Sequence, residues 1–432
     1  MRNNIVHAGA HELRYEIREI VEIGNKLSDM GLDICWENIG DPVNKGERIP
    51  PWIKNIVKKA IDDDSSFAYC PTKGLDKTRE FLAGLCNKRG KAQITKEDII
   101  FFNGLGDAIS KVYNYLRKEA RIIGPSPAYS THSSGEAAHA GKDHLMYKLD
   151  PDNNWFPDLK GLRNKVKNNK VISGILVINP NNPAGTVYPK EVMMEIVKIA
   201  EEFDLFIICD EVYLNITYNG TVSTPLSDII NNVCGISMKG ISKELPWPGA
   251  RCGWIEVYNK DIDPVFSEYV NTMLNAKMLE VCSTTLPQQV IPHLLCDSRY
   301  NKHLVERNKM YEKKSKFAYD TLREIDGIIV NQTDGAFYMT VVFKDGVLKD
   351  KQRLKISDNA INNYIEKITQ DVALDKRFVY YLLGATGICV VPLTGFSCNR
   401  YGFRITLLET DEKKFEWIFT TIAEKIKDYL NS

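Results

Sequence analysis

The sequence predicts an α/β protein in which a mostly parallel, doubly wound sheet is joined to a smaller α+β domain. Two observations support this prediction. Between residues 95 and 260, short apolar runs alternate with segments of helical periodicity, which is the order expected of strand–helix–strand units in a parallel sheet. After residue 325, short strands, an insertion-like segment over 346–375 and a closing amphipathic helix follow one another, which indicates a second domain of mixed type.

The predicted strands of the large sheet are DIIFFNG, EARIIGP, GILVINP, LFIICDE and CGISMKGIS. KEVMMEIVKIAEEFD separates the third run from the fourth, and Val192, Ile196 and Ile199 lie near one face of a helix there. Each run ends in turn or polar residues. Because open parallel sheets bind ligands beyond the carboxyl ends of their strands, we expect the chemistry in the residues directly after these runs.

The second domain is predicted from both ends of the chain. A helical pattern over 10–30 precedes the sheet, and a long charged helix over 298–325 follows it. The strands expected near the C-terminus are AFYMTVVF, GICVVPL and GFRITLLE, and the last helix is EKKFEWIFTTIAEKIKDYL. We predict a large domain over 50–310 and a small domain formed by 1–49 and 311–432.

Composition restricts the class of partner. The 432 residues include 56 Lys and Arg and 56 Asp and Glu, so the net charge is zero. This balance argues against a general nucleic-acid binder or a basic membrane-surface protein and favours a small-molecule ligand. The 10 cysteines form no CxxC pair and no zinc-like cluster with the 7 histidines, and no apolar stretch is long enough to cross a membrane. We therefore expect a cytoplasmic protein with reduced thiols and no metal.

Four polar residues follow one another along the chain, and three of them lie at or near the ends of the predicted strands. Asn182 belongs to NPNNPAG, Asp210 follows LFIIC, Lys243 follows CGISMKGIS, and Arg251 comes eight residues later. The first three have an ordinary structural interpretation: a turn amide for Asn182, a helix N-cap for Asp210 and a solvated lysine for Lys243. The functional alternative is an amide donor, a carboxylate for a protonated ring nitrogen, a nucleophilic amine and a fork of donors for phosphate.

In combination, NPNNPAG, DEVY and SKELPWPGARCGW resemble the fold-type-I pyridoxal-phosphate enzymes, specifically the class I and II aminotransferases, from about Gly40 to the C-terminus. The resemblance implies pyridoxal 5′-phosphate as cofactor, and an amino acid and a 2-oxo acid as substrates. It implies that Lys243 forms the Schiff base with the cofactor and moves the substrate proton. Asp210 would pair with the pyridinium nitrogen, while Asn182 and Tyr213 would bind the phenolic oxygen.

The resemblance also implies a cup for the cofactor phosphate. Backbone N–H groups of Leu105 and Gly106, in FFNGLGDAIS, would open a helix N-terminus toward the phosphate, and Ser242 and Arg251 would complete the cup. Tyr129, in PAY, matches an aromatic residue that stacks on the cofactor, although an aromatic residue near a turn is more often part of a core.

The substrate and the neighbouring subunit would be contacted by three further residues. Arg404, in YGFRITLLE, matches the arginine that binds the α-carboxylate, with a structural pair to Glu409 as the alternative. Gly40 would let its backbone approach the same carboxylate. Tyr69 matches a tyrosine that reaches the phosphate of a second subunit, which implies a homodimer; packing against its own domain is the alternative.

The sequence departs from the family pattern at three places. Gly240 stands where the family has Ser or Thr on the phosphate, so that Ser237, Ser242 or Lys239 would have to compensate. A PLTGF turn over 392–396 and the long segment over 346–375 fall where the small domain meets the substrate, so the choice of substrate stays open.

Three activities are therefore considered. Trp36, Ile39, Tyr129 and Phe396 suggest an aliphatic or aromatic pocket, which slightly favours a neutral or aromatic amino donor for a ping-pong aminotransferase. A C–S lyase of the same fold would keep the same cofactor residues. A ligand-sensing regulator would need an added DNA-binding segment, for which we expect no room in the roughly forty residues before Gly40.

Overall fold

The computed structural model describes residues 4–13 and 16–432. Its main feature is an eight-stranded sheet in the order β2-β9-β8-β7-β6-β3-β4-β5. The strands are β2 Ile99–Phe102, β3 Arg121–Ser126, β4 Met146–Asp150, β5 Phe156–Pro157, β6 Ile172–Ile178, β7 Phe206–Asp210, β8 Gly235–Gly240 and β9 Gly253–Tyr258. Pairing is parallel from β4 through β3, β6 and β7 to β8, and only β5 and β9 run against their neighbours. The prediction of a mostly parallel sheet is confirmed.

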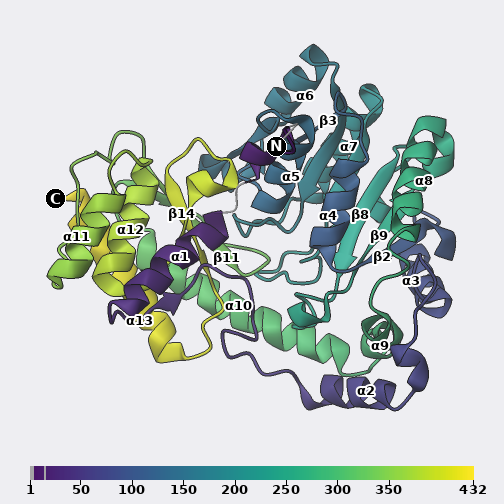
Figure 1. Ribbon diagram of the computed structural model, residues 1–432, viewed down its shortest axis with the longest axis horizontal. Coiled ribbons are helices and arrows are strands. Elements are labelled where there is room, and N and C mark those ends of the chain that lie inside the picture. The colour runs from purple at the N-terminus through teal and green to yellow at the C-terminus, as the bar shows by residue number, and fades with distance from the viewer. Residues whose placement is uncertain (1–3, 14–15) are drawn as a thin grey trace.

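Successive residues of these strands enter different hydrophobic cores, which is why the predicted strands are continuous apolar runs. In β7, Ile207 and Cys209 belong to the core that includes α7, whereas Ile208 belongs to the core that includes α4. Helices cover both faces of the sheet in Figure 1. The sheet is therefore doubly wound, as the sequence predicts.

The helices are α1 Glu16–Asp29, α2 Pro51–Ile61, α3 Asp76–Arg89, α4 Leu105–Asn114, α5 Ser130–Ala140, α6 Leu159–Asn168, α7 Lys190–Glu202, α8 Pro264–Met278, α9 Thr285–Leu295, α10 Tyr300–Leu322, α11 Asn359–Ile368, α12 Leu374–Thr386 and α13 Glu412–Leu430. Of the helix predicted over 10–30, residues 16–29 form α1, and residues 14 and 15 lie outside the described residues. None of the described helices combines the length and apolar character needed to cross a membrane.

A second, antiparallel sheet has the order β10-β11-β14-β13. Its strands are β10 Ile328–Val330, β11 Tyr338–Phe343, β13 Val391–Pro392 and β14 Gly402–Thr406. The predicted strand GICVVPL divides into two pieces, because β12 Ile388–Cys389 pairs instead with β1 Cys35–Trp36 from the other end of the chain. The long segment over 346–375 contains α11.

The two ends of the chain share one core. α1 and α13 pack with α10 and the second sheet, and in Figure 1 the purple α1 lies beside the yellow C-terminal elements. The short helix Ala10–Glu12 instead contacts α5 of the large sheet. The segment from β1 to α2 therefore passes between the two sheets, beside the strand ends of the large one.

Candidate active site

Lys243 lies in the loop that follows β8, between the two sheets. Its Nζ donates a hydrogen bond to the backbone oxygen of Gly40 at 2.7 Å. The same Nζ lies 5.9 Å from the ring centroid of Tyr213 and 5.6 Å from that of Phe337. The amine is thus enclosed by one carbonyl and two aromatic rings, and no carboxylate forms an ion pair with it among the described residues.

These surroundings favour the neutral amine. Burial lowers the pKa of Lys243 to about 8. The guanidinium groups of Arg404 and Arg251 act in the same direction, whereas the carboxylates of Asp41 and Asp210 act against it. A fraction of the lysine is therefore an unprotonated nucleophile near neutral pH.

Asp210 is the last residue of β7 and is buried. Its Oδ2 lies 3.2 Å from Nε2 of His132, and its Oδ1 accepts from the backbone N–H of Val212 at 3.1 Å. His132 Nδ1 in turn lies 3.2 Å from the hydroxyl of Tyr113. The carboxylate is therefore fixed in position rather than capping a helix.

His132 was not expected from the sequence. It is separated from Asp210 by 78 positions in the chain, and it lies on α5, whose sequence STHSSGEAAHA has no strong apolar periodicity. The available signal was a histidine in the first turn after the PSPAY strand end. Because parallel strands end at one edge of the sheet, that position lies beside the end of β7.

Tyr213 is paired with a second tyrosine that the sequence analysis also missed. Its hydroxyl lies 2.9 Å from the hydroxyl of Tyr338, and both side chains are almost fully buried. Burial raises the pKa of Tyr213 above its ordinary range, and the nearby Tyr338 acts in the same direction. A Cβ on Gly40 would overlap the Tyr338 hydroxyl. Glycine is therefore required at position 40 for Tyr338 to reach Tyr213.

Arg404 is a buried arginine on β14. Its Nη1 donates to Oδ1 of Asn182 at 3.2 Å, and its Nη2 donates to the backbone oxygen of Asn38. Its guanidinium lies 4.5 Å from the Tyr338 ring centroid and 4.9 Å from that of Phe396. A guanidinium flanked by aromatic rings and neutral oxygens can still bind an incoming carboxylate.

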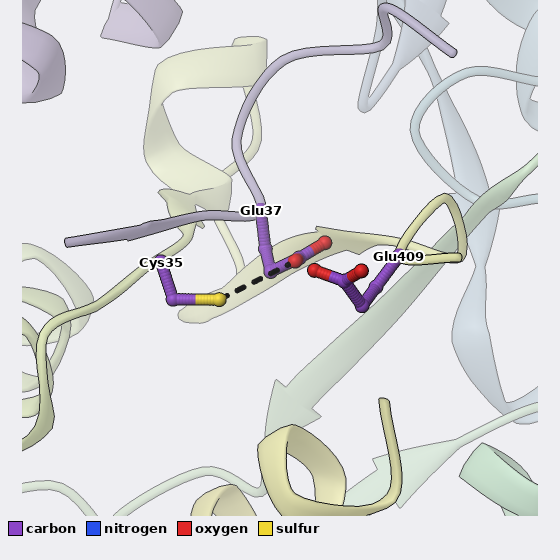
Figure 2. Close-up of side chains that lie close together, drawn as sticks. All are labelled: Cys35, Glu37 and Glu409. Carbon is purple, nitrogen blue, oxygen red and sulfur yellow. Dashed lines mark hydrogen bonds between the residues drawn. The ribbon is translucent and has the colours of Figure 1, made fainter. Parts of the chain in front are cut away.

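Among the described residues no ion pair joins Arg404 to Glu409, so the alternative of a structural pair between them is not supported. Figure 2 shows Glu409 beside Glu37 and Cys35, the one described group of three side chains close enough to share a metal ion. Lys45 already supplies a cation there, with its Nζ 2.5 Å from Glu37 and 3.3 Å from Glu409. Burial raises the pKa of the Cys35 thiol to about 12, so it stays protonated. The cluster therefore ties the segment that carries Gly40 to the end of β14.

The start of α4 has the features of an anion site. Gly104 has φ +85°, and the N–H groups of Leu105 and Gly106 have no acceptor among the described residues. A Cβ built on Gly106 would meet nothing within 4 Å, whereas one on Gly104 would overlap the guanidinium of Arg251. Two free N–H groups, an open space and a guanidinium fit a phosphate group.

Gly240 lies in a closely packed part of the sheet. It pairs with Gly253 on β9, and a Cβ at Gly240 would lie 3.1 Å from the backbone oxygen of Cys252. Two of the three compensating residues that we considered are used elsewhere: Lys239 lies 2.7 Å from Glu256, and Ser237 donates to Glu211. Ser242 keeps its place next to Lys243 and is only partly exposed.

The two aromatic candidates differ in their placement. The ring of Tyr129 meets that of His132 edge to face at 6.5 Å, which places Tyr129 near the Asp210 carboxylate. Tyr69, by contrast, is 84% exposed at the surface of the chain. The alternative that Tyr69 packs against its own domain therefore finds no support.

Comparisons with known proteins show which family the chain is similar to. The family model for aminotransferase class I and II matches residues 37–418. An uncharacterized aminotransferase of Methanocaldococcus jannaschii is 57% identical over 432 residues, 100% of both chains. The glutamate-pyruvate aminotransferase AlaA of Escherichia coli K12 is 28% identical over 328 residues, 75% of this chain and 79% of its own.

Solved structures show the same fold. An alanine aminotransferase from Pyrococcus furiosus superposes with a TM-score of 0.82 at 25% identity, covering 98% of each chain. An aminotransferase from Escherichia coli superposes with a TM-score of 0.83 at 24% identity, covering 96% of each chain.

Proposed function

The chain belongs to the class I and II aminotransferases, a family that uses pyridoxal 5′-phosphate, and we propose from this premise that it moves the amino group of an L-amino acid to a 2-oxo acid by a ping-pong reaction. The observation that carries the proposal is the environment of Lys243. Its amine has a lowered pKa and lies in one site with the guanidinium groups of Arg404 and Arg251. One site thus combines a nucleophile with binding groups for two anions.

The residues of the site match the parts of the cofactor. When bound, pyridoxal phosphate supplies an electrophilic aldehyde and a ring that accepts electrons. The N–H groups of Leu105 and Gly106, with Ser242 and Arg251, would hold its phosphate. The Asp210 carboxylate, fixed by His132, would hold a proton on the ring nitrogen.

The opposite edge of the ring would face two neutral donors. Tyr213 stays protonated because burial raises its pKa, so it can donate a hydrogen bond to the phenolic oxygen. The Oδ1 of Asn182 accepts from Arg404, which leaves the NH₂ group of Asn182 to donate to the phenolic oxygen of the cofactor. Tyr129 would cover one face of the ring.

Lys243 would act twice. Its Nζ would hold the cofactor through the aldehyde, and its neutral amine would take the proton from the substrate α-carbon. Arg404 would bind the α-carboxylate in two bonds and so orient the α C–H toward Nζ. The Gly40 carbonyl, 2.7 Å from Nζ, would help to hold the amine on the substrate side.

We infer a neutral amino donor, with alanine the first to test. The rings of Tyr338 and Phe396 flank Arg404, and a small or apolar side chain fits such surroundings better than a second carboxylate. The alanine aminotransferase from Pyrococcus furiosus among the solved structures supports the same choice.

We also infer a cytoplasmic homodimer in which Tyr69 reaches the phosphate of the second subunit. Phe67 and Leu279 are 74% and 87% exposed, and Met278 and Val281 are at least half exposed. A surface of this kind marks an association site. Sedimentation distinguishes these two contributions. Tyr69→Phe should lose only a phosphate contact and remain a dimer, whereas Leu279→Asp should lose the interface.

Absorbance of the cofactor tests the activity. We expect purified protein loaded with pyridoxal phosphate to lose its visible band on addition of alanine and to regain it on addition of a 2-oxo acid. Lys243→Ala should lose both the covalently attached cofactor and turnover, while Lys190→Ala, which alters an exposed lysine, should keep both. Full turnover in Lys243→Ala would refute the proposal. Release of pyruvate and ammonia from a cysteine conjugate with no 2-oxo acid would instead indicate a lyase.

A further inference from the structure

The turn over 393–397, between β13 and β14, is held on one side by the large sheet. Three successive backbone oxygens of this turn accept hydrogen bonds from the segment 126–130, which runs from the end of β3 to the start of α5. The pairs are Ser130 Oγ with Gly395 at 2.8 Å, the N–H of Ala128 with Phe396 at 2.9 Å and Ser126 Oγ with Ser397 at 2.7 Å. The turn therefore lies in register with the segment that carries Tyr129.

A buried carboxylate holds the same turn from the other side. Asp375 lies in the first turn of α12 and has no exposed surface. Its Oδ2 accepts from the backbone N–H of Thr394 at 2.9 Å, and its Oδ1 accepts from the Thr394 hydroxyl at 2.9 Å. The backbone N–H of Lys376 donates to the same Oδ1 at 2.8 Å. Both oxygens of the carboxylate are thus used, and both are joined to Thr394.

The charge of Asp375 suits this arrangement. Burial raises its pKa to about 6, and hydrogen bonds from Thr394, Lys376 and Gly402 act against that rise. At neutral pH the side chain is therefore a carboxylate, which accepts hydrogen bonds and donates none. In Asp375→Asn the shape is kept, but an NH₂ group replaces one acceptor and faces a donor, so at least one hydrogen bond is lost.

The turn sets the position of the Phe396 ring. This ring is fully buried, and its centroid lies 4.9 Å from the guanidinium of Arg404. Arg404 itself is placed by the pairing of β14 with β13, in which it lies opposite Val391. Because the ring borders the place expected for the substrate α-carboxylate, a shift of the turn would change the space that is left for the donor side chain.

We propose that Asp375 is a positioning residue for the amino donor: through Thr394 it keeps the turn 393–397 in place, and so holds the Phe396 ring where it limits the size of the donor side chain. This inference rests on the proposed function and deepens it, since it names the group that favours a small donor. Asp375 acts through the turn and does not itself contact the substrate.

Amide hydrogen exchange tests the role of Asp375 in the turn. In the purified chain, with and without pyridoxal phosphate, we expect the peptide that covers 393–397 to exchange several-fold faster in Asp375→Asn than in the wild-type protein. Thr394→Val, which loses the hydroxyl and keeps the N–H, should lie between the two, and Thr394→Ser should match the wild type. If Asp375→Asn does not fold, the comparison of Thr394→Val with Thr394→Ser decides in the same way. Equal exchange in all of these proteins would overturn the proposal.

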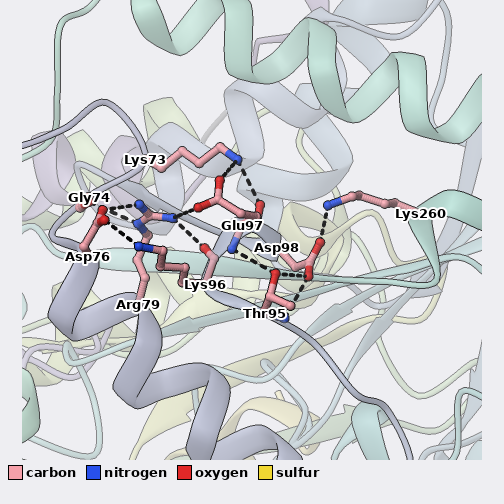
Figure 3. Close-up of polar contacts among 9 residues, drawn as sticks. All are labelled: Lys73, Gly74, Asp76, Arg79, Thr95, Lys96, Glu97, Asp98 and Lys260. Atoms are coloured by element: carbon pink, nitrogen blue, oxygen red, sulfur yellow. Dashed lines mark hydrogen bonds and ion pairs between the residues drawn. The ribbon is translucent and has the colours of Figure 1, made fainter.

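Figure 3 shows a matched control. Asp98 Oδ2 accepts from the backbone N–H of Thr95 at 2.8 Å and from its hydroxyl at 2.9 Å, so Asp98→Asn also removes the carboxylate of an Asp–Thr pair. Asp98 directly precedes β2, and β9, β8, β7 and β6 separate β2 from β3 in the sheet. A general loss of stability would therefore affect both variants, whereas a change in the turn 393–397 would affect only Asp375→Asn.

Steady-state kinetics of the cofactor-loaded protein test the effect on the donor. We expect Asp375→Asn to raise the KM for alanine roughly 3–10-fold and to keep kcat within about 2-fold, because binding is altered and the chemical step is not. The ratio of kcat/KM for leucine to that for alanine should rise in Asp375→Asn and stay unchanged in Asp98→Asn.

Two kinetic results would overturn the proposal: an unchanged KM and ratio in Asp375→Asn, or equal changes in Asp375→Asn and Asp98→Asn. Absence of transamination in the wild-type protein would instead refute the proposed function. The exchange experiment gives its answer about the turn in either case, so the failures of the two proposals are distinguishable.

Discussion

Replacing Lys243 by methionine should stabilise the cofactor-free protein, and the size of the gain should depend on pH. The buried amine has a pKa of about 8 instead of 10.5. Since one pKa unit corresponds to about 1.36 kcal/mol, folding the protonated lysine costs about 3 kcal/mol at pH 7. Methionine fills a similar volume and carries no charge, so the variant avoids this cost.

The sign follows from proton binding. Between pH 8 and 10.5 the unfolded chain keeps the lysine proton that the folded chain has lost, so the wild-type protein gains stability as the pH rises through this range. Below pH 8 both states are protonated and the difference is constant. The advantage of Lys243→Met should therefore fall from about 3 kcal/mol at pH 7 to about 1.4 kcal/mol at pH 9.5.

Urea unfolding of the cofactor-free proteins at pH 7, 8.5 and 9.5 measures this difference. The variant also leaves the Gly40 carbonyl without its donor, at a cost of about 1 kcal/mol that does not change with pH. The decisive quantity is therefore the slope with pH. Lys190→Met, at the exposed start of α7, should show no slope relative to the wild-type protein. A pH-independent difference for Lys243→Met would refute the reasoning.

Two further changes test the surroundings of the site, and another tests a buried ion pair at the start of β3. Gly40→Ala should raise the KM for the amino donor and lower the melting temperature, because its Cβ overlaps the Tyr338 hydroxyl; Tyr338→Phe in the same chain should recover part of both. Arg121→Met leaves the buried Glu136 carboxylate without its guanidinium and should cost about 3–5 kcal/mol of unfolding free energy, measured with urea, whereas the further change Glu136→Gln should restore part of it. His132→Phe removes a hydrogen bond to a charged group, worth roughly 1.5–3 kcal/mol, so kcat/KM should fall roughly 10–100-fold; an unchanged value would show that the imidazole does not support the aspartate.

The strand ends of the large sheet could be predicted because each is marked by the apolar run directly before it in the sequence. An apolar run buried on both faces must be followed by the residues that leave the sheet, so Asp210 and Lys243 could be placed at one edge without knowing the strand order. The strand β9 was missed because it runs antiparallel between β2 and β8, so no helical crossover separates it from β8 in the sequence.

The residues that hold these side chains in position could not be predicted in the same way. Tyr213 and Tyr338 are 125 positions apart, and Arg404 reaches the backbone of Asn38 across 366 positions. No local pattern records such contacts, since they depend on how the two sheets face each other.

By itself, therefore, the sequence determined the fold class, the order of the chemical groups along the sheet edge and the family that they resemble. Only the tertiary structure decided which of those groups share a site and that Gly40 leaves room for Tyr338 to reach Tyr213. The physical reason is that secondary structure follows from periodicity within one segment, whereas a buried polar site requires partners that distant segments must supply.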